Sequence, residues 1–321
     1  MSKKKYYLTL DTETATLPFI SSMELTAKER QNLAIAKPLV YDIGWTITDR
    51  NGEIQKMENF LIQETFFVPQ VFQTAYYKEK RPIYIQLLKD GKIKTACWND
   101  VVEILLEDLR KCDFACAFNA AFDFKKAIPF TERYIKALYN DYNDWEEKQK
   151  ASCQAILNGE SGKNENYLEP IFTLRNEDFA ICDLWQVACK KLLNNQAYKD
   201  YCLKNQFLTT SGTYFKTSAE TTFSYLTRNC QFVEEHTALS DAIIESEILR
   251  KILVKGKIEP SLQAFPFREL GETTEYVKQE KKRKYIPVVV NQINVYLENS
   301  GKDNGYTRRL EKIVRELNEM E

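Results

Sequence analysis

Histidine is nearly absent from this sequence, whose 321 residues include one, His236. The eight cysteines form no C-x-x-C pair, and four of them would need irregular spacing to hold a zinc ion. Because structural zinc sites use closely spaced cysteine and histidine ligands, the sequence excludes a zinc-finger protein. A chain of this length needs no disulfide bonds for stability, so we expect reduced thiols and a cytoplasmic location.

Long apolar runs and an excess of one charge are also missing. The longest apolar runs, such as residues 286–290, are far short of the ~20 residues of a membrane-spanning helix. The apolar stretch after Lys5 ends at Asp11, too early for a signal peptide. The 45 Lys and Arg residues and 46 Asp and Glu residues leave a net charge of −1. We therefore expect no membrane partner, and nucleic acid must be bound through a local basic patch or through metal ions that offset acidic side chains.

The hydrophobic pattern predicts strands in the N-terminal part of the chain. Alternating apolar residues indicate strands over Tyr6–Glu13, Val40–Thr48 and Glu53–Ile62. Asn51 and Gly52 predict a hairpin turn between the last two strands, with both turn residues at positive φ.

Helical periodicity dominates the following part. The further elements that we predict are helices over 21–37, Val101–Leu109, Asp183–Leu193, 218–228 and Ser240–Val254, a strand over Asp113–Phe118, and a hairpin of Phe207–Thr210 and Thr213–Thr217. Asn119 is expected to cap a helix that begins near Ala120. Residues 140–170 are polar and are expected to form a solvated excursion. This order of elements indicates an α/β or α+β arrangement around a mixed sheet.

The pattern changes near residue 255. Prolines interrupt it, a basic run covers 278–284, and Tyr306–Glu321 has the apolar stripe of an amphipathic helix. We therefore expect one domain over 1–254 and a C-terminal extension over 255–321. The basic run is typical of a solvated surface, but it also suits contact with a nucleic-acid backbone.

Two carboxylates occupy the end of the first predicted strand. Asp11 and Glu13 are two positions apart and therefore project from the same side of a strand. Like charges at this separation resist ionisation, and a hard cation such as Mg²⁺ or Mn²⁺ between them removes the conflict. Exposed acids at a strand end are the simpler explanation of this pair taken alone.

Two further acids and the histidine fall near predicted helix starts. Asp123 is expected in the first turn of the helix after Asp113–Phe118, where any acid is favoured. Asp241 leads a buried helical stripe, and no lysine or arginine stands one turn away on it. A metal ion would compensate the burial of this carboxylate. His236 is expected on the loop before the helix, from which it can reach a metal-bound water.

Taken in order, these residues resemble a nuclease family. D-x-E at 11–13, N-x-x-F-D at 119–123 and H-x-A-x-x-D at 236–241 resemble the motifs of the DEDDh subgroup of DnaQ-like 3′→5′ exonucleases. These enzymes include proofreading subunits of DNA polymerases and RNA-trimming enzymes. The resemblance covers roughly residues 5–254. The intervals of 112 positions between Asp11 and Asp123 and 118 between Asp123 and Asp241 indicate insertions into a compact core.

The resemblance implies a fold and a mechanism. The fold is α/β, a ribonuclease H-like mixed sheet with flanking helices, carrying insertions and the C-terminal extension. The site holds two divalent cations, Mg²⁺ or Mn²⁺. Asp11 would bridge both ions, Glu13 and Asp241 would complete one, Asp123 would help to hold the other, and His236 would be the general base. The products would be nucleoside 5′-monophosphates released from a free 3′ end.

Aromatic and polar side chains near the motifs are candidates for substrate binding. The candidates are Thr12, Phe19, Asn119 and Phe122. Phe19 follows a proline and is the best candidate for a wedge against a base, whereas Phe118 is assigned to core packing. Lys216 and Arg228 are placed to contact phosphates, although the segment around them also fits a simple edge hairpin.

Three alternatives stay open at this point. DNA is favoured as the substrate, but an RNA-trimming exoribonuclease has the same motifs. A non-catalytic adaptor on this fold would use the C-terminal helix to dock a polymerase, another protein or a second copy of the chain, although the intact acidic set argues against it. An endonuclease, with the extra segments setting its substrate, is the third alternative.

Overall fold

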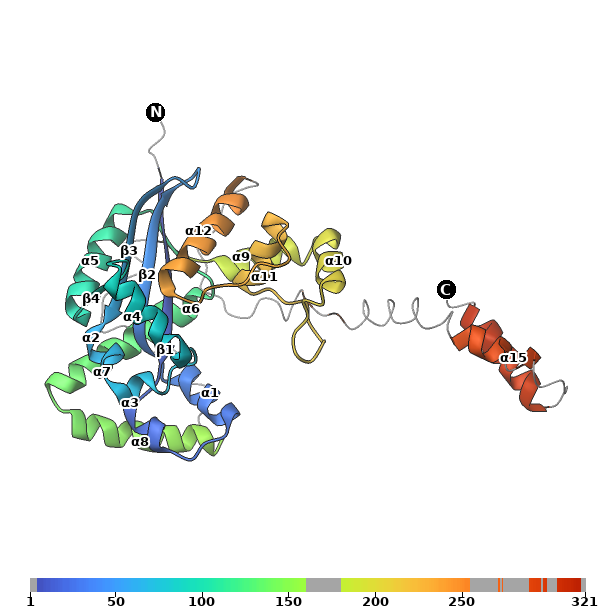
Figure 1. Ribbon diagram of the computed structural model, residues 1–321, viewed down its shortest axis with the longest axis horizontal. Helices are drawn as coiled ribbons and strands as arrows, with labels where there is room; N and C mark the ends of the chain where they lie inside the picture. Colours follow the sequence, from blue (N-terminus) through green and yellow to red (C-terminus); the bar gives the residue numbers. More distant parts are fainter. Residues whose placement is uncertain are drawn as a thin grey trace.

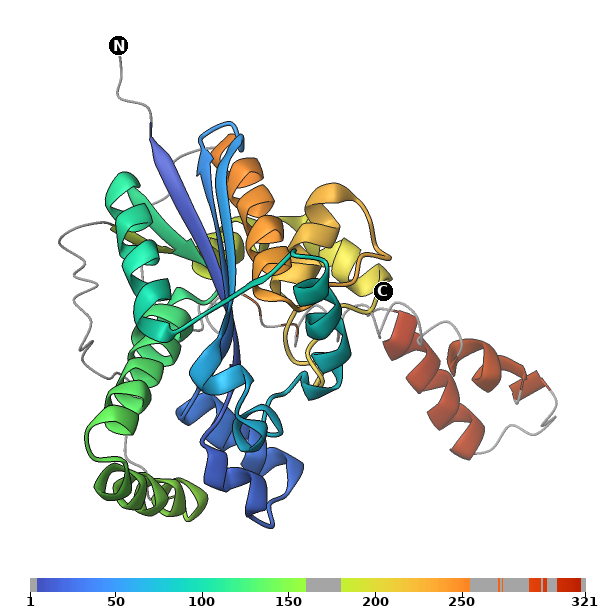
Figure 2. The ribbon, with the colours of Figure 1, turned by 60° about the vertical axis from the view of Figure 1, so that its left-hand side comes forward.

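The computed structural model describes residues 5–159, 180–254, 271, 273, 289–295, 297–298 and 305–318. Within this part of the chain, the centre is a mixed sheet with helices on both faces (Figures 1 and 2). The strands are β1 (Tyr6–Ala15), β2 (Leu39–Asp49), β3 (Ile54–Ile62), β4 (Lys94–Ala96), β5 (Phe114–Ala117) and β6 (Ala180–Asp183). Their order is β4-β3-β2-β1-β5-β6. Strand β2 is antiparallel to β1 and β3, and the other neighbouring pairs are parallel.

The helices follow the predicted order with several additions. Their bounds are η1 (Pro18–Ser22), α1 (Ala27–Ala36), α2 (Gln63–Phe66), α3 (Pro69–Phe72), η2 (Lys78–Lys80), α4 (Arg81–Lys89), α5 (Trp98–Lys111), α6 (Ala120–Phe122), η3 (Asp123–Ala127), α7 (Ile128–Tyr139), α8 (Tyr142–Leu157), α9 (Leu184–Leu192), α10 (Gln196–Lys204), α11 (Ala219–Thr227), α12 (Ala238–Val254) and α15 (Gly305–Asn318). The α/β class with a mixed sheet is therefore confirmed.

Each face of the sheet has its own core. Leu8 and Leu10 of β1 join the larger core with residues of α5 and α7, whereas Tyr7 joins the core formed with α9 and α12. Figure 2 shows α12 in orange on one side of the blue strands, with green α5 and α7 on the other. Because β1 alternates, Asp11 and Glu13 lie on the same face as Tyr7, which is the α12 face.

Several local predictions were wrong in detail. In the β2–β3 turn Gly52 alone has a positive φ, of 82°, and Asn51 does not. The Asp49 side chain accepts hydrogen bonds from the backbone of Asn51 and Glu53, which stabilises a turn that needs only one left-handed residue. Asn119 occupies the N-cap position but makes no side-chain cap, because its backbone is left-handed, with φ of 78°.

Two segments are more ordered than the polar pattern indicates. Residues 142–157, expected to be a solvated excursion, form α8, whose Cys153 is buried and whose Trp145 packs against Phe130 and Tyr134. The rest of the excursion, 160–170, lies outside the described residues. Strand β6 was not predicted, because Ala180–Asp183 is too short to show a period.

The second hairpin is confirmed in a reduced form. Residues 207–217, called the 207–217 hairpin below, pair through one isolated bridge between Leu208 and Phe215. Ser218 then caps α11 by accepting from Thr221 N, as predicted. Thr273 donates through its hydroxyl to the carbonyl oxygens of Gly212 and Thr213, so a residue beyond 254 contacts this hairpin.

The C-terminal helix is confirmed as an amphipathic element. α15 carries an apolar stripe whose Ile313 is exposed. The basic run 278–284 lies outside the described residues. Among the helices that the structure describes, none has the length and apolar character needed to cross a membrane.

Candidate functional site

The site lies on the α12 face of the sheet, where β1 meets β2. Asp11 of β1 is paired with Gly44 of β2. An added Cβ at Gly44 would lie 2.4 Å from Leu239 N, so the absence of a side chain allows the first turn of α12 to rest on the sheet. This contact brings Asp241 next to the two acids of β1.

Strand β2 holds the start of α12 in place. Asp42 Oδ2 accepts hydrogen bonds from Ala238 N and from the Tyr84 hydroxyl, each over 2.9 Å. Farther along the helix, the hydroxyls of Thr46 and Ser246 are 2.6 Å apart. The helix that carries Asp241 is therefore capped by an acid of a neighbouring strand, since the free N–H groups at a helix start need acceptors.

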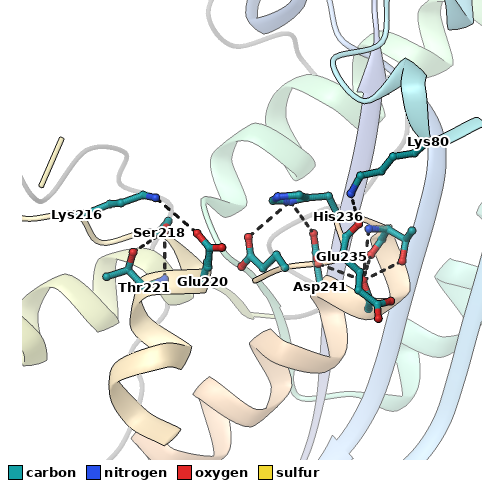
Figure 3. Close-up of polar contacts among 11 residues, drawn as sticks. Lys80, Lys216, Ser218, Glu220, Thr221, Glu235, His236 and Asp241 are labelled. Carbon is teal, nitrogen blue, oxygen red and sulfur yellow. Dashed lines mark hydrogen bonds and ion pairs between the residues drawn. The ribbon is translucent and has the colours of Figure 1, made fainter. Parts of the chain in front are cut away.

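Glu13, His236 and Asp241 form a group with the geometry of a cation site. One ligand atom from each lies within 4.8 Å of the others. His236 Nδ1 is 3.7 Å from Asp241 Oδ2, and Figure 3 shows the two side chains pointing toward one another. His236 lies on the loop before α12, as predicted, with a left-handed φ of 51°. Backbone strain of this kind is concentrated at functional sites.

Asp123 approaches the group from the other face of the sheet. It begins η3, a π-helical stretch within the continuous helical segment 120–139. The Thr12 hydroxyl donates to Asp123 Oδ1 over 2.6 Å. Burial raises the pKa of Asp123 to about 7, although the bond from Thr12 opposes the shift. Thr12 therefore positions an acid, a role that the sequence did not predict, and its contact with substrate stays a prediction.

Asp11 lies among like charges. Burial raises its pKa well above the usual range, and the charges of Glu245 and Asp123 add to the shift. Burial likewise raises the pKa of Glu13, with a contribution from Asp241. The four acids and the histidine predicted from the motifs are thus gathered around one position, with Asp11 and Asp123 outside the tight group of three.

Glu245 is a buried acid of this site that the motif analysis missed. It stands one helical turn after Asp241, and its Oε2 accepts from Phe118 N over 3.1 Å. Burial raises its pKa, and the charges of Asp123 and Asp241 add to the shift. The signal in the sequence was its position four residues after Asp241, which places both acids on the same face of the helix.

Two more acids surround the site. Asp183, at the end of β6, accepts from Gln186 N and Asn119 N, and burial raises its pKa to about 6. Glu234 Oε2 is 3.7 Å from His236 Nδ1, and burial together with Asp241 raises its pKa to about 8. Neither residue belongs to a recognisable motif.

A segment between β3 and β5 contacts the histidine. The Tyr77 ring stacks on His236 with centroids 4.4 Å apart and 14° between the planes. Lys80 Nζ donates to the Glu235 carbonyl and lies 4.7 Å from the Tyr77 centroid (Figure 3). Nothing in the sequence pattern links residues 77–80 to His236, so this contact was not predictable.

The remaining candidates for substrate binding are described by what they pack against. Phe19 and Phe122 pack partly buried against the larger core, and Lys150 Nζ lies 5.6 Å over the Phe19 ring. Phe118 packs against the other core, as predicted. Asn119 is tied to Asp183 through its backbone. The roles of Phe19, Phe122 and Asn119 in substrate binding stay predictions.

The donor set fits a hard divalent cation. Carboxylate oxygens suit Mg²⁺ or Mn²⁺, and buried carboxylates that repel one another are stabilised by a cation. Glu13, Asp241 and Asp11 are the residues that would hold it. For Glu13, Lys80 is the cation whose charge opposes the rise in pKa.

We expect Mn²⁺ or Mg²⁺ to raise the melting temperature of the protein. Binding to the folded state alone adds about 2.7 kcal/mol to the free energy of unfolding when the cation is at 100 times its Kd. Differential scanning fluorimetry with increasing Mn²⁺ measures the effect. Asp241→Asn should remove most of it, whereas Asp144→Asn, at an exposed position of α8, should not. An equal shift in both variants would contradict a site at Asp241.

The metal-free protein is expected to lose stability as pH rises from about 4 to about 8. The folded pKa values are about 6 for Asp183, about 7 for Asp42 and Asp123, and about 8 for Glu234, against ordinary values of 3.8 and 4.5. In this window the folded state holds more protons than the unfolded state, so each rise in pH favours unfolding. Thermal melts in EDTA between pH 5 and pH 8 test this, and a melting temperature that increases with pH would contradict it.

Comparison with known proteins does not assign a family. No family model matches this chain, and no curated protein gives a significant match. Its function must therefore be inferred from its own residues.

Proposed function

We propose that this chain is a metal-dependent 3′→5′ exonuclease of the DEDDh type, which hydrolyses nucleic acid to nucleoside 5′-monophosphates. One observation carries the proposal: Asp11 and Glu13 of β1, Asp123 of η3, Asp241 of α12 and His236 on the loop before α12 converge on one position. These residues come from three distant parts of the chain. The mixed sheet with helices on both faces also agrees with the ribonuclease H-like architecture that the motifs imply.

Two divalent cations are part of the proposal. Glu13 and Asp241 would hold one, Asp123 would help to hold the other, and Asp11 would contact both. The cations would neutralise phosphate charge and lower the pKa of the attacking water. They also explain how an acidic cluster accepts a polyanion. Thr12 contributes by fixing the orientation of the Asp123 carboxylate.

His236 is the proposed general base. Its Nδ1 faces the carboxylates of Glu234 and Asp241, each 3.7 Å away, so Nε2 is the atom that takes the proton from water. The two carboxylates stabilise the imidazolium that results, and the Tyr77 ring fixes the plane of the imidazole.

Single-stranded oligonucleotides provide the direct test. With a 5′ label and Mg²⁺ or Mn²⁺, we expect a ladder that shortens from the 3′ end, and EDTA should stop it. DNA and RNA are compared side by side, with DNA expected to be the better substrate. A circular single strand should stay intact, since it has no end. Cleavage of the circle would instead identify an endonuclease.

A non-catalytic adaptor is the second candidate. The apolar stripe of α15, in which Ile313 is exposed, favours it, because such a face suits a polymerase, another protein partner or a second copy of the chain. Unchanged oligonucleotides under all metal conditions would favour this candidate.

A further inference from the structure

A cavity of about 310 Å³ opens beside the acidic cluster, at the end of β5. Its walls include Phe118, Asn119, Trp185, Phe215, Lys216 and Thr217. They come from the end of β5, the start of α9 and the 207–217 hairpin. The volume is at the lower end of the range of ligand pockets and suits one small unit rather than a duplex.

Backbone N–H groups at the floor of the cavity form hydrogen bonds with the buried acids Glu245 and Asp183. Phe118 N donates to Glu245 Oε2 over 3.1 Å, and Asn119 N donates to Asp183 Oδ1 over 3.3 Å. The charge of Asp183 in turn raises the pKa of Asp123, so these carboxylates are neighbours. The cavity therefore adjoins the acidic cluster.

Lys216, on the hairpin wall of the cavity, is linked to the histidine through Glu234. Its charge lowers the pKa of Glu234, whose carboxylate is 3.7 Å from His236 Nδ1. Figure 3 shows Lys216 reaching toward Glu220 on this side of the site. That ion pair spans 3.6 Å and the Lys216 side chain is 43% exposed. Pairs of this kind contribute little, so a phosphate can replace Glu220 as the partner.

The cavity combines the chemistry of a base and that of a phosphodiester. The half-buried Phe118 and Trp185 supply aromatic wall, and Trp185 Nε1 donates to Thr217 Oγ1 over 2.8 Å. Flat bases stack on such rings without sequence preference. The ammonium group of Lys216 is suited to the adjoining phosphate.

We propose that this cavity binds the nucleotide preceding the 3′-terminal one, with its base against Trp185 and its phosphate at Lys216. The proposal rests on the exonuclease function for the position of the 3′ end. It assigns to the 207–217 hairpin the role of holding an unpaired strand. Because every base can stack on an aromatic ring, the cavity accepts all four bases.

Binding to the full chain tests the proposal. The probe is a 5′-fluorescein-labelled oligo(dT), with oligo(U) in parallel and Ca²⁺ in place of Mg²⁺. Anisotropy should show about a tenfold higher Kd for Trp185→Leu, with most affinity kept by Trp185→Phe. Lys216→Gln should lower the slope of log K against log salt by about 0.7, the value for one phosphate contact on a single strand. Lys204→Gln, at an exposed position of α10, is the charge-matched control and should leave the slope unchanged.

The outcomes separate this proposal from the exonuclease function. Suppose that the wild type hydrolyses the oligonucleotide, but Trp185→Leu leaves the Kd unchanged and Lys216→Gln leaves the salt slope unchanged. This result overturns the cavity assignment and leaves the exonuclease function standing. If these variants lose binding and the wild type does not hydrolyse the oligonucleotide, the cavity binds a strand but the exonuclease function is rejected. If Trp185→Leu does not fold, the Lys216 and Lys204 pair decides, since both side chains are surface-accessible.

Discussion

Asp11→Asn is expected to lower the rate of 3′-end hydrolysis by about 10³-fold or more, without unfolding the protein. Asp11 is surrounded by Glu245, Asp123, Glu13 and Asp241, and a neutral amide there removes the negative charge that the proposed cations need. The same change relieves repulsion among buried acids, so the melting temperature in EDTA should rise. Single-turnover hydrolysis of a 5′-labelled oligonucleotide and thermal melts give the two readouts.

Asp90→Asn is the matched control for this substitution. Asp90 directly follows α4 as its C-cap, is exposed and pairs with Lys92 on the surface. It should change neither the rate nor the melting temperature appreciably. An Asp11→Asn protein that hydrolyses at the wild-type rate would refute the assignment of Asp11, whereas loss of activity together with a lower melting temperature would indicate a structural role.

Gly44→Ala is expected to destabilise the protein by about 1–3 kcal/mol and to reduce hydrolysis strongly. The added Cβ would lie 2.4 Å from Leu239 N and 2.7 Å from Ala238 C, which are backbone atoms that cannot rotate away. The first turn of α12 must therefore move off the sheet and carry Asp241 with it. Urea unfolding measures the stability, and the hydrolysis assay measures the displacement.

Gly91→Asn is the comparison for this substitution. Gly91 has open space around it and a φ of +67°, a conformation that asparagine tolerates. Its stability and activity should stay near those of the wild type. If Gly44→Ala were as stable and active as Gly91→Asn, the close approach of α12 to β2 would not be what positions Asp241.

The sequence predicted the parts of the site that depend on local periodicity. Alternation along β1 correctly placed Asp11 and Glu13 on one face, and helical spacing placed Asp241 at the start of a buried stripe. The loop position of His236 followed from the same helix start. The convergence of these segments came from the family motifs, because no pattern within one element specifies a contact between elements.

The rest depends on contacts between segments that are distant in sequence. Asp42 caps α12 from a position 196 residues earlier, and Thr12 binds Asp123 across 111 residues. Tyr77 reaches His236 from an insertion without a motif. Asn119, whose backbone is left-handed, donates its N–H to Asp183 at the end of a strand too short to be predicted. Tertiary packing, rather than local propensity, decides each of these cases.

The capping of α12 by Asp42 has a consequence for the order of assembly. Strands β1 and β2 leave the ribosome early, but the helix that completes the acidic cluster ends at Val254. Pairings of such long sequence separation form late, since a large loop must close first. A nascent chain that has not yet released α12 therefore carries no complete site. We therefore expect the proposed hydrolysis to begin only after α12 has been synthesised.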